Sequence, residues 1–276
     1  MTTIGIVGAG RAGAGLAVAL TRAGYRVRLH GRSPIDLPAA IDFGYGGKPH
    51  WLGDVDALIL AVPDDTLGEL ARELACDSRI AAVPVVLHLS GVLDSSILEP
   101  IAECGCAVGS LHPLQSLSDS ETAAERLRGA AVAIEGDPQA TQLAGELAAA
   151  LEMTPLRVNS DAKPLYHAAA VFASNYLVVV AATAQRLLER AGVSSEAARA
   201  ALVPIIRGTI ENIVRAGAAG ALTGPVARGD SATVRKHLDV LPPDEAALYR
   251  ALGSAALNIA RLDKDEWESL KRELER

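Results

Sequence analysis

Aromatic residues and lysines are scarce in this chain of 276 residues. Phe, Trp and Tyr make up only 3% of the chain although half of it is hydrophobic, so the core has to be built from Ala, Val, Leu and Ile. Only five of the 26 basic residues are lysines. This preference for arginine suggests that Lys163 is present for its titratable amine.

Cysteine is also rare. Cys76, Cys104 and Cys106 are odd in number and lack the spacing of metal ligands, so we expect reduced thiols in a cytoplasmic protein and no bound metal. The formal net charge of −7 argues against nucleic acid or an anionic membrane as the main partner. No apolar run approaches a membrane span without Gly or charge, and Met1 leads into a strand rather than a signal peptide, so we expect no membrane segment.

The start of the chain has the pattern of a dinucleotide-binding unit. A β-branched run at 3–7 is followed by Gly8-Ala9-Gly10-Arg11-Ala12-Gly13, a helical segment at 14–23 and a second strand at 26–30. Strand, glycine loop, helix and strand within about 30 residues is the context that such a fingerprint requires. A tight turn without a ligand is the plain alternative.

Each glycine of this loop has an expected role. Gly8 permits the tight turn, Gly10 lets the backbone reach the pyrophosphate, and Gly13 lets the helix approach the strand. The helix begins at the phosphates, so Arg11 and Ala12 should also contact the cofactor through the N–H groups and dipole of its first turn.

The end of the second strand indicates which cofactor is used. An NAD enzyme needs Asp or Glu there to hold the ribose 2′-hydroxyl, whereas this chain has His30-Gly31-Arg32-Ser33. Arg32 and Ser33 can bind a 2′-phosphate through charge-assisted hydrogen bonds. The sequence therefore predicts NADP(H), with a merely solvated Arg32 as the alternative.

Further apolar runs and helical segments complete a predicted α/β domain over residues 1–158, with a Rossmann-type, doubly wound and mostly parallel sheet. Residues 34–54 are expected to form an irregular connection without chemistry. A helix from about residue 64 should be capped by Asp64 or Asp65. The remaining strands are expected at 55–62, 83–89, 106–111, 130–135 and 155–158, with another helix at 138–151.

Ligands of open α/β sheets bind beyond the carboxyl ends of the strands. The residues at such ends that we expect to line the cofactor and substrate pocket are Val62, Pro63, Ser90, Gly91, His112 and Gln115. For His112, a purely structural His-Pro turn is an open alternative. His88 lies inside its strand and is expected to be a hydrogen-bonded core residue.

Residues 159–276 show helical patterns only, and a helix of about 28 residues should begin near Ser160 or Asp161, with Pro164 in its first turn. Lys163 and His167 are four residues apart and share one face of this helix. A cation and an imidazole there cost free energy unless they are used, so we predict that both are catalytic. Ser174, two turns later, and the neighbouring Asn175 are predicted substrate contacts.

The rest of this half should contain helices at 194–216, 231–240 and 242–261, followed by a charged, solvated tail from Asp263. The loop at 222–230 ends in Arg228-Gly229-Asp230. Arg228 is suited to grip a substrate carboxylate with two parallel hydrogen bonds, and Asp230 is a further candidate contact. Alternatively, the two residues pair with each other or cap the next helix.

Several motifs together resemble a bacterial family of Rossmann-like proteins with a C-terminal helical domain of unknown function. The motifs are the glycine loop, Ala61-Val-Pro-Asp-Asp65, His88-Leu-Ser-Gly91, Leu111-His-Pro-Leu-Gln115, Ala162-Lys-Pro-Leu-Tyr-His167, Phe172-Ala-Ser-Asn-Tyr176 and Leu222-Thr-Gly-Pro-Val-Ala-Arg-Gly-Asp230. The layout is similar to ketopantoate reductase, pyrroline-5-carboxylate reductase and the β-hydroxyacid dehydrogenases. In two of these groups a Lys followed four residues later by Asn opens the long helix. Lys163 matches that Lys, whereas His167 replaces the Asn.

The resemblance implies an NADP-binding domain, a helical domain at 159–276 that dimerises, and reduction of a small 2-oxo acid. Ketopantoate to pantoate, a step of pantothenate synthesis, is the leading substrate pair on the resemblance alone. Lys163 or His167 would donate the proton that the carbonyl oxygen needs, and Ser90 would help to orient the substrate. An imine reductase and a non-catalytic NADP(H) sensor remain alternatives, because a fold does not fix a function.

Overall fold

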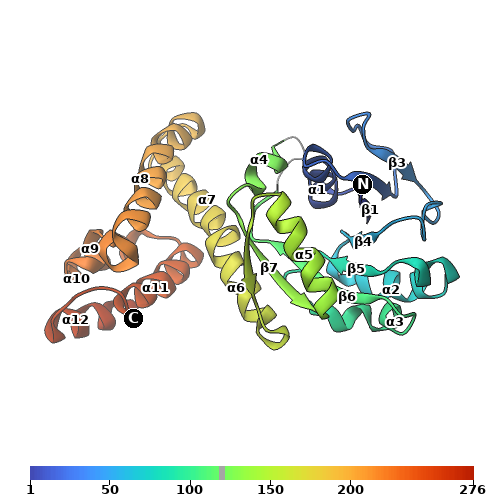
Figure 1. Ribbon diagram of the computed structural model, residues 1–276. Helices are drawn as coiled ribbons and strands as arrows, with labels where there is room; N and C mark the ends of the chain where they lie inside the picture. Colours follow the sequence, from blue (N-terminus) through green and yellow to red (C-terminus); the bar gives the residue numbers. More distant parts are fainter. Residues whose placement is uncertain (118–121) are drawn as a thin grey trace. The chain divides into compact units, whose positions relative to one another are not determined.

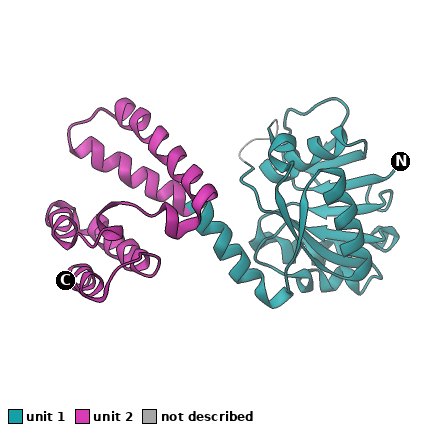
Figure 2. Ribbon diagram, turned by 60° about the vertical axis from the view of Figure 1, so that its left-hand side comes forward, with its two compact units in different colours: residues 1–175 teal, residues 176–276 magenta. Residues whose placement is uncertain are grey.

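The computed structural model describes residues 1–117 and 122–276. The chain forms two compact units, residues 1–175 and residues 176–276, which are described separately (Figure 2). The first unit contains the whole β-sheet together with helix α6 (Lys163–Ala173), and the second unit consists of helices (Figure 1).

The sheet of the first unit has the strand order β3-β2-β1-β4-β5-β6-β7-β8. Neighbouring strands are parallel except β6 and β7, which are antiparallel. The predicted fold class, a doubly wound and mostly parallel sheet followed by helices, is confirmed. The strands are β1 (Thr3–Val7), β2 (Arg26–Gly31), β3 (Asp42–Tyr45), β4 (Ala57–Leu60), β5 (Val85–His88), β6 (Ala107–Pro113), β7 (Ala131–Gly136) and β8 (Thr154–Arg157).

Helices cover both faces of this sheet, and each face has its own apolar core. Side chains of α1, α4 and α5 pack in one core, and side chains of α2 and α3 pack in the other. On β4, Ile59 faces the first core while Leu58 and Leu60 face the second, because successive side chains of a strand point to opposite faces. The helices of this unit besides α6 are α1 (Arg11–Arg22), α2 (Asp64–Ala75), α3 (Glu99–Ala102), α4 (Ala123–Leu127) and α5 (Pro138–Ala150), with 3-10 turns at Ser78–Ala82, Ser95–Leu98 and Ser160–Ala162.

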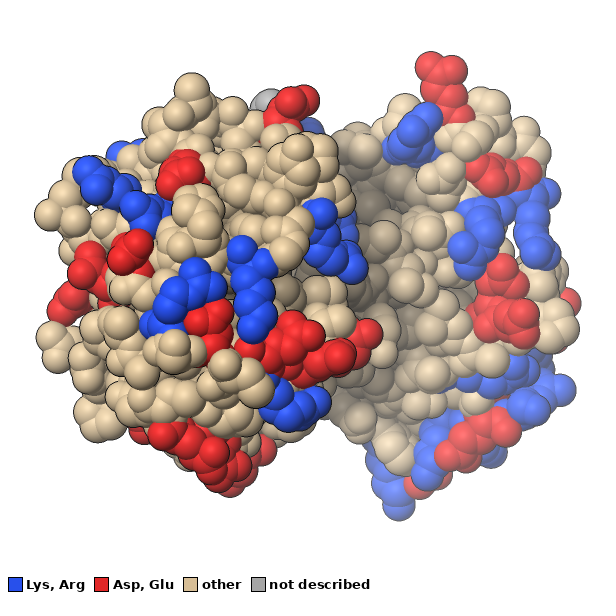
Figure 3. Space-filling view, turned by 90° about the vertical axis from the view of Figure 1, so that its right-hand side faces the viewer, with Lys and Arg blue, Asp and Glu red and all other residues tan. Residues whose placement is uncertain are grey.

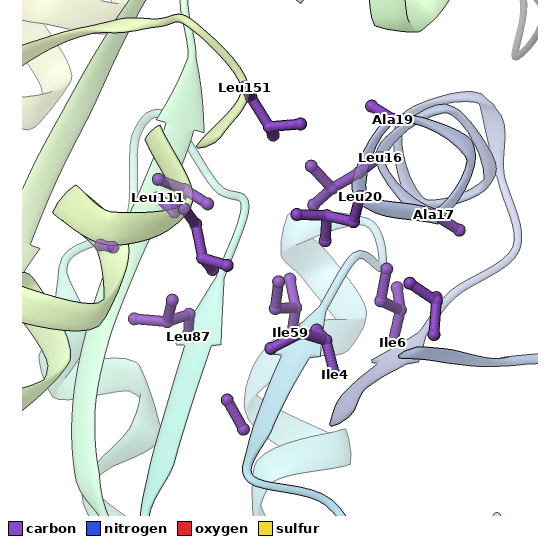
Figure 4. Close-up of a cluster of buried hydrophobic side chains, with 14 of the residues drawn as sticks. Ile4, Ile6, Leu16, Ala17, Ala19, Leu20, Ile59, Leu87, Leu111 and Leu151 are labelled. Atoms are coloured by element: carbon purple, nitrogen blue, oxygen red, sulfur yellow. The ribbon is translucent and has the colours of Figure 1, made fainter. Parts of the chain in front are cut away.

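Helix α1 is anchored to the sheet by aliphatic side chains. Leu16 and Leu20 lie on the side of α1 that faces Ile59 of β4 (Figure 4), and all three side chains are buried. Burial of a leucine side chain contributes about 1.5–3 kcal/mol, so these side chains hold α1 against the sheet.

Strand β3 corrects the prediction of an irregular connection at 34–54. Its four residues extend the sheet beside β2, with Phe43 opposite Leu29. The strand is short, contains Gly44 and is flanked by Pro and Gly residues, so its local pattern is that of a loop. Pairing with β2, a tertiary contact, makes it a strand.

The predicted single helix from Ser160 is also wrong. It consists of α6 and α7 (Asn175–Arg190), which are separated at Ser174, where φ is −122° and ψ is −71°. No Gly or Pro marks this break in the sequence. Neither Ser160 nor Asp161 caps a helix as expected, since no side chain caps α6. Pro164 lies in the first turn of α6, as predicted.

By length and composition, the stretch Ser160–Arg190 could cross a membrane, so the expectation that no apolar run approaches a membrane span is wrong. One such stretch is weak evidence, although its most apolar window is not buried in the structure. Its first residues belong to the sheet unit, where the side chain of Lys163 is buried against polar groups.

The second unit has a small core of its own. The charged tail predicted from Asp263 is instead helix α12, which begins with a capping box between Asp263 and Glu266 and buries Leu270 and Leu274. A short helix, α9, lies within the predicted loop at 222–230. The helices after α7 are α8 (Ser195–Ala221), α9 (Gly224–Ala227), α10 (Ser231–Val240), α11 (Pro243–Leu257) and α12 (Lys264–Leu274).

Positive and negative side chains alternate over the face of the molecule that Figure 3 shows. Many are paired in the described parts of the chain, as Arg28 with Asp42 at 3.5 Å and Arg79 with Asp77 at 2.7 Å. Ion pairs near the surface contribute little to stability, because solvent screens them. The face in Figure 3 therefore lacks the continuous basic surface with which proteins bind nucleic acid.

Candidate active site

The glycine loop joins β1 to α1 in the geometry that a dinucleotide fingerprint requires. Gly8 has a φ of +114°, which favours glycine, and a Cβ there would lie 2.2 Å from the carbonyl oxygen of Ala61. A Cβ on Gly13 would lie 1.8 Å from the carbonyl oxygen of Gly8. The turn at Gly8 and the close approach of α1 at Gly13 thus both depend on the missing side chains.

The start of α1 fits an anionic ligand. No side chain caps the helix, and no acidic residue lies in its first turn. A Cβ on Gly10 would meet nothing within 4 Å, so the space beside the loop is open. The N–H groups of Arg11, Ala12 and Gly13 lie at the positive end of a helix of 12 residues, as binding of a pyrophosphate requires.

The end of β2 fits a 2′-phosphate. Arg32 and Ser33 follow the strand directly and are both exposed, and no carboxylate occurs among residues 30–33. On the other side of the loop, Val62 lies against Gly8, since its Cγ1 would be 3.2 Å from a Cβ there. Pro63 takes the N-cap position of α2, so the predicted cap by Asp64 or Asp65 is wrong, and both lie in the first turn instead.

Two imidazoles converge on Gly91, just beyond β5. His112 lies near the end of β6 and His167 lies on α6, with their ring centroids 6.0 Å apart. A Cβ on Gly91 would be 2.8 Å from Nε2 of His112 and 2.7 Å from Cδ2 of His167. Glycine at position 91 therefore allows both rings to lie against the strand end.

His112 is held by Tyr166, which the sequence did not single out. Nδ1 of His112 and the phenol oxygen of Tyr166 are 2.9 Å apart, and the two rings are nearly perpendicular. Burial, followed by the charges of His167 and Lys163, lowers the pKa of His112 to about 4. Burial also raises the pKa of Tyr166 to about 12. Both members of the pair are therefore neutral near pH 7.

A cavity of about 170 Å³ lies between His112 and Ala12, the residue before the last glycine of the glycine loop. It is smaller than the roughly 300–1,000 Å³ of pockets that enclose a whole ligand, so it suits one ring or a small substrate. It brings the start of α1 and the end of β6 to one place, at the carboxyl edge of the sheet. Its lining residues are Ala12, Leu16, Leu89, His112, Pro113, Gln115 and Leu117.

Lys163 does not line this cavity and is buried, with only 1% of the residue exposed. Its amine donates hydrogen bonds to the carbonyl oxygen of Ser90 at 3.1 Å and to Oγ of Ser110 at 2.7 Å. It also lies 3.7 Å from a carboxylate oxygen of Glu135. The amine of Lys163 is thus sealed under the loop at Ser90, while His167, one turn later, remains half-buried.

Glu135, which the sequence analysis missed, balances the charge of Lys163. The carboxylate accepts hydrogen bonds from the N–H and hydroxyl of Ser95 and from the hydroxyls of Ser110 and Ser160. Burial alone would raise the pKa of Glu135, but these bonds and the charge of Lys163 lower it below its ordinary value. Burial lowers the pKa of Lys163, and the charge of Glu135 opposes that shift.

Ser90 shapes the loop over this ion pair. Its hydroxyl accepts hydrogen bonds from the N–H groups of Val92 and Leu93. Its own N–H donates to Nδ1 of His88, which is fully buried, so the prediction of a hydrogen-bonded core histidine is confirmed. Burial lowers the pKa of His88 to about 4.

The remaining predicted contacts are in several places. The amide of Gln115 donates to the carbonyl of Arg126, although the residue also lines the cavity. Ser174 and Asn175 lie at the break between α6 and α7. Arg228 and Asp230 belong to the second unit, where both carboxylate oxygens of Asp230 accept hydrogen bonds from Thr233 at the start of α10, the capping alternative. Residues 1–117 and 122–276 contain no cluster of His, Cys, Asp and Glu suited to a metal.

Replacing Lys163 by Met should strongly destabilise the protein, because Glu135 would stay buried without its counter-charge. We expect a loss of about 3–5 kcal/mol in the free energy of unfolding, measured with urea. The double change Lys163→Met with Glu135→Gln should recover part of it. The exposed pair of Arg128 and Glu152 is the matched control, where Arg128→Ala should cost below about 1 kcal/mol. Equal losses for Lys163→Met and Arg128→Ala would contradict this account.

Two family models match the chain in succession. Residues 52–113 match a Rossmann-like domain, and residues 130–256 match a domain of unknown function, DUF2520. A curated relative, glycerol-3-phosphate dehydrogenase [NAD(P)+] of Shouchella clausii, is 31% identical over 146 residues. That match covers 45% of this chain and 42% of the relative, so it spans less than half of either protein.

Solved structures extend the similarity over nearly the whole chain. A protein of Thermotoga maritima has a TM-score of 0.69 at 23% identity, covering 93% of this chain and 98% of that one. A Bacteroides fragilis protein, provisionally assigned as an NADP oxidoreductase, has a TM-score of 0.71 at 22% identity, with 92% and 97% covered. Pyrroline carboxylate reductase of Plasmodium falciparum, solved with NADP bound, has a TM-score of 0.61 at 12% identity, with 100% and 97% covered. Residues 52–113 thus match a Rossmann-like domain and residues 130–256 match DUF2520, and the whole chain has a fold similar to that of these solved structures.

Proposed function

We propose that the protein is an NADPH-dependent reductase of a small carbonyl substrate. The observation that carries the proposal is the cavity between the uncapped start of α1 and His112, at the carboxyl edge of the sheet. In doubly wound folds this edge is where a dinucleotide and its substrate meet. The exposed Arg32 and Ser33 favour the phosphorylated cofactor.

The residues around Gly91 would stabilise the charge that develops on the substrate. When bound, the dihydronicotinamide supplies a hydride ion to the carbonyl carbon. The carbonyl oxygen then gains negative charge and needs hydrogen-bond donors in a water-poor site. In this proposal His112 would donate a hydrogen bond, and His167 would donate the proton that completes the alcohol and regain one from solvent. Lys163 would act indirectly, by holding the Ser90 loop in place.

A 2-oxo acid is the substrate class that we favour, with ketopantoate as the first choice. The family resemblance of the Lys163 motif supports this choice, and reduction would give pantoate for pantothenate synthesis.

An imine is the second candidate, and one observation favours it. His112 is neutral near pH 7, and the amine of Lys163 is already bonded to Ser90 and Ser110. An imine substrate arrives already protonated and makes little demand on an acid from the protein. A site without a strong proton donor would therefore be sufficient for an imine reductase of the pyrroline-5-carboxylate type.

A direct test is to follow NADPH consumption with a panel of 2-oxo acids, including ketopantoate, and cyclic imines. We expect steady turnover with at least one 2-oxo acid and weaker turnover with imines. Turnover of imines alone would replace the first candidate by the second. Tight NADPH binding without turnover of any member would contradict both and favour a non-catalytic NADP(H) sensor.

The choice of cofactor is tested by Arg32→Ala. Loss of the guanidinium should weaken NADPH binding by about tenfold or more, the effect of a charge-assisted hydrogen bond, and leave NADH binding nearly unchanged. Titration of the protein into NADPH or NADH, followed by the fluorescence of the nucleotide, gives the two dissociation constants. Equal losses for the two cofactors would show that Arg32 does not bind the 2′-phosphate.

We also propose that the protein forms a homodimer through its helical unit. Val178, Val203, Ile205 and Val214 of α7 and α8 are between 41% and 83% exposed, an apolar surface that a monomer would leave in water. In a symmetric dimer, the same helices of a second copy would cover this apolar surface. Sedimentation velocity at micromolar concentration should give twice the chain mass of 28.6 kDa, whereas a monomer at all concentrations would contradict the proposal.

A further inference from the structure

Residues 1–117 and 122–276 contain two His–Tyr pairs of nearly the same geometry. In the first, Nδ1 of His112 is 2.9 Å from the phenol oxygen of Tyr166, with ring centroids 5.6 Å apart. In the second, Nδ1 of His237 is 2.9 Å from the phenol oxygen of Tyr249, with centroids 5.7 Å apart. The first pair lies in the sheet unit beside Gly91, and the second lies within the helical unit.

In the first pair, the distances favour one acceptor for the phenol proton. The phenol of Tyr166 has two possible acceptors, Nδ1 of His112 at 2.9 Å and the carbonyl oxygen of His112 at 3.5 Å. The longer distance is outside the ordinary range of an O–H···O hydrogen bond, so Nδ1 is the better placed acceptor and we infer that Tyr166 donates to it. Nδ1 is then the acceptor, and a neutral imidazole must carry its single proton on Nε2.

Nε2 is the nitrogen that faces the candidate site. It would be 2.8 Å from a Cβ on Gly91, and the ring of His112 lines the 170 Å³ cavity. The titratable groups around this ring are Tyr166, His167, Asp64 and, behind the loop, the amine of Lys163. Among residues 1–117 and 122–276, the hydrogen bond of this ring to the protein is made by Nδ1, so an N–H on Nε2 is available to a ligand.

We propose that Tyr166 is a positioning residue that fixes His112 in the tautomer with the proton on Nε2, so that His112 donates a hydrogen bond to the substrate oxygen. The substrate part rests on the proposed reductase function, whereas the tautomer is a property of the protein alone. Without the phenol, Nδ1 loses its donor, and the ring is free to place its proton on either nitrogen.

The tautomer can be measured without any ligand. In protein labelled with ¹⁵N-histidine, long-range ¹H–¹⁵N correlation spectra at pH 7 distinguish protonated from unprotonated ring nitrogens for each of the six histidines. We expect His112 to show protonated Nε2 and unprotonated Nδ1. In Tyr166→Phe both nitrogens should move toward the averaged shifts of a tautomer mixture. A protonated Nδ1 in the parent protein overturns the proposal even if the variant does not fold, and so does an unchanged ring in a folded variant.

Steady-state kinetics, with any substrate that the panel identifies, tests the second step. Tyr166→Phe should lower kcat by about tenfold or more, within the range for a group that assists transfer to a developing oxyanion, while the Kd for NADPH stays unchanged. Tyr249→Phe is the matched control, because it removes the same phenol from the second pair and should leave kcat unchanged. A normal kcat in Tyr166→Phe, or equal losses in the two variants, would overturn a role in the reaction. If no substrate is turned over, the reductase assignment fails while the tautomer measurement still decides the role of Tyr166.

Discussion

The buried ion pair of Lys163 and Glu135 is the interaction on which the site depends. It joins three parts of the first unit that are far apart in sequence: the loop at Ser90, the strand β7 that carries Glu135, and the start of α6. Two opposite charges in this position cost several kcal/mol of desolvation each, which is offset only by their attraction and by the hydrogen bonds from Ser95, Ser110 and Ser160. Such a pair fixes geometry more than it adds stability.

The consequence of this constraint is the placement of the imidazoles. Once Lys163 is fixed, His167 follows one helical turn later and meets His112 at Gly91, where a side chain would displace both rings. Tyr166, which lies between Lys163 and His167 in the sequence, holds His112 through Nδ1. Lys163 is thus sealed from solvent and fixes the position of α6, whereas His112 lines the cavity and His167 lies beside it, with the two ring centroids 6.0 Å apart.

Local patterns predicted the doubly wound sheet, the glycine loop and the helical second half, because buried parallel strands and Gly8 to Gly13 carry strong local signals. The same patterns could not predict strand β3 or the break at Ser174, since pairing with β2 and tertiary packing decide them. They predicted that Lys163 and His167 share one helix face, but they could not predict that the amine of Lys163 is buried while the ring of His167 is half-buried. Glu135 was the missed partner, although a carboxylate at the end of an apolar strand was a usable signal for a buried counter-charge.

The central claim is that the site at Gly91 faces the reactive end of a bound nicotinamide cofactor. Titration of ¹³C-histidine-labelled protein with NADP⁺, followed through the six ring signals, tests it most directly. We expect saturable shifts of the His112 and His167 signals. Saturable binding of NADP⁺ that leaves both His112 and His167 unshifted would contradict it.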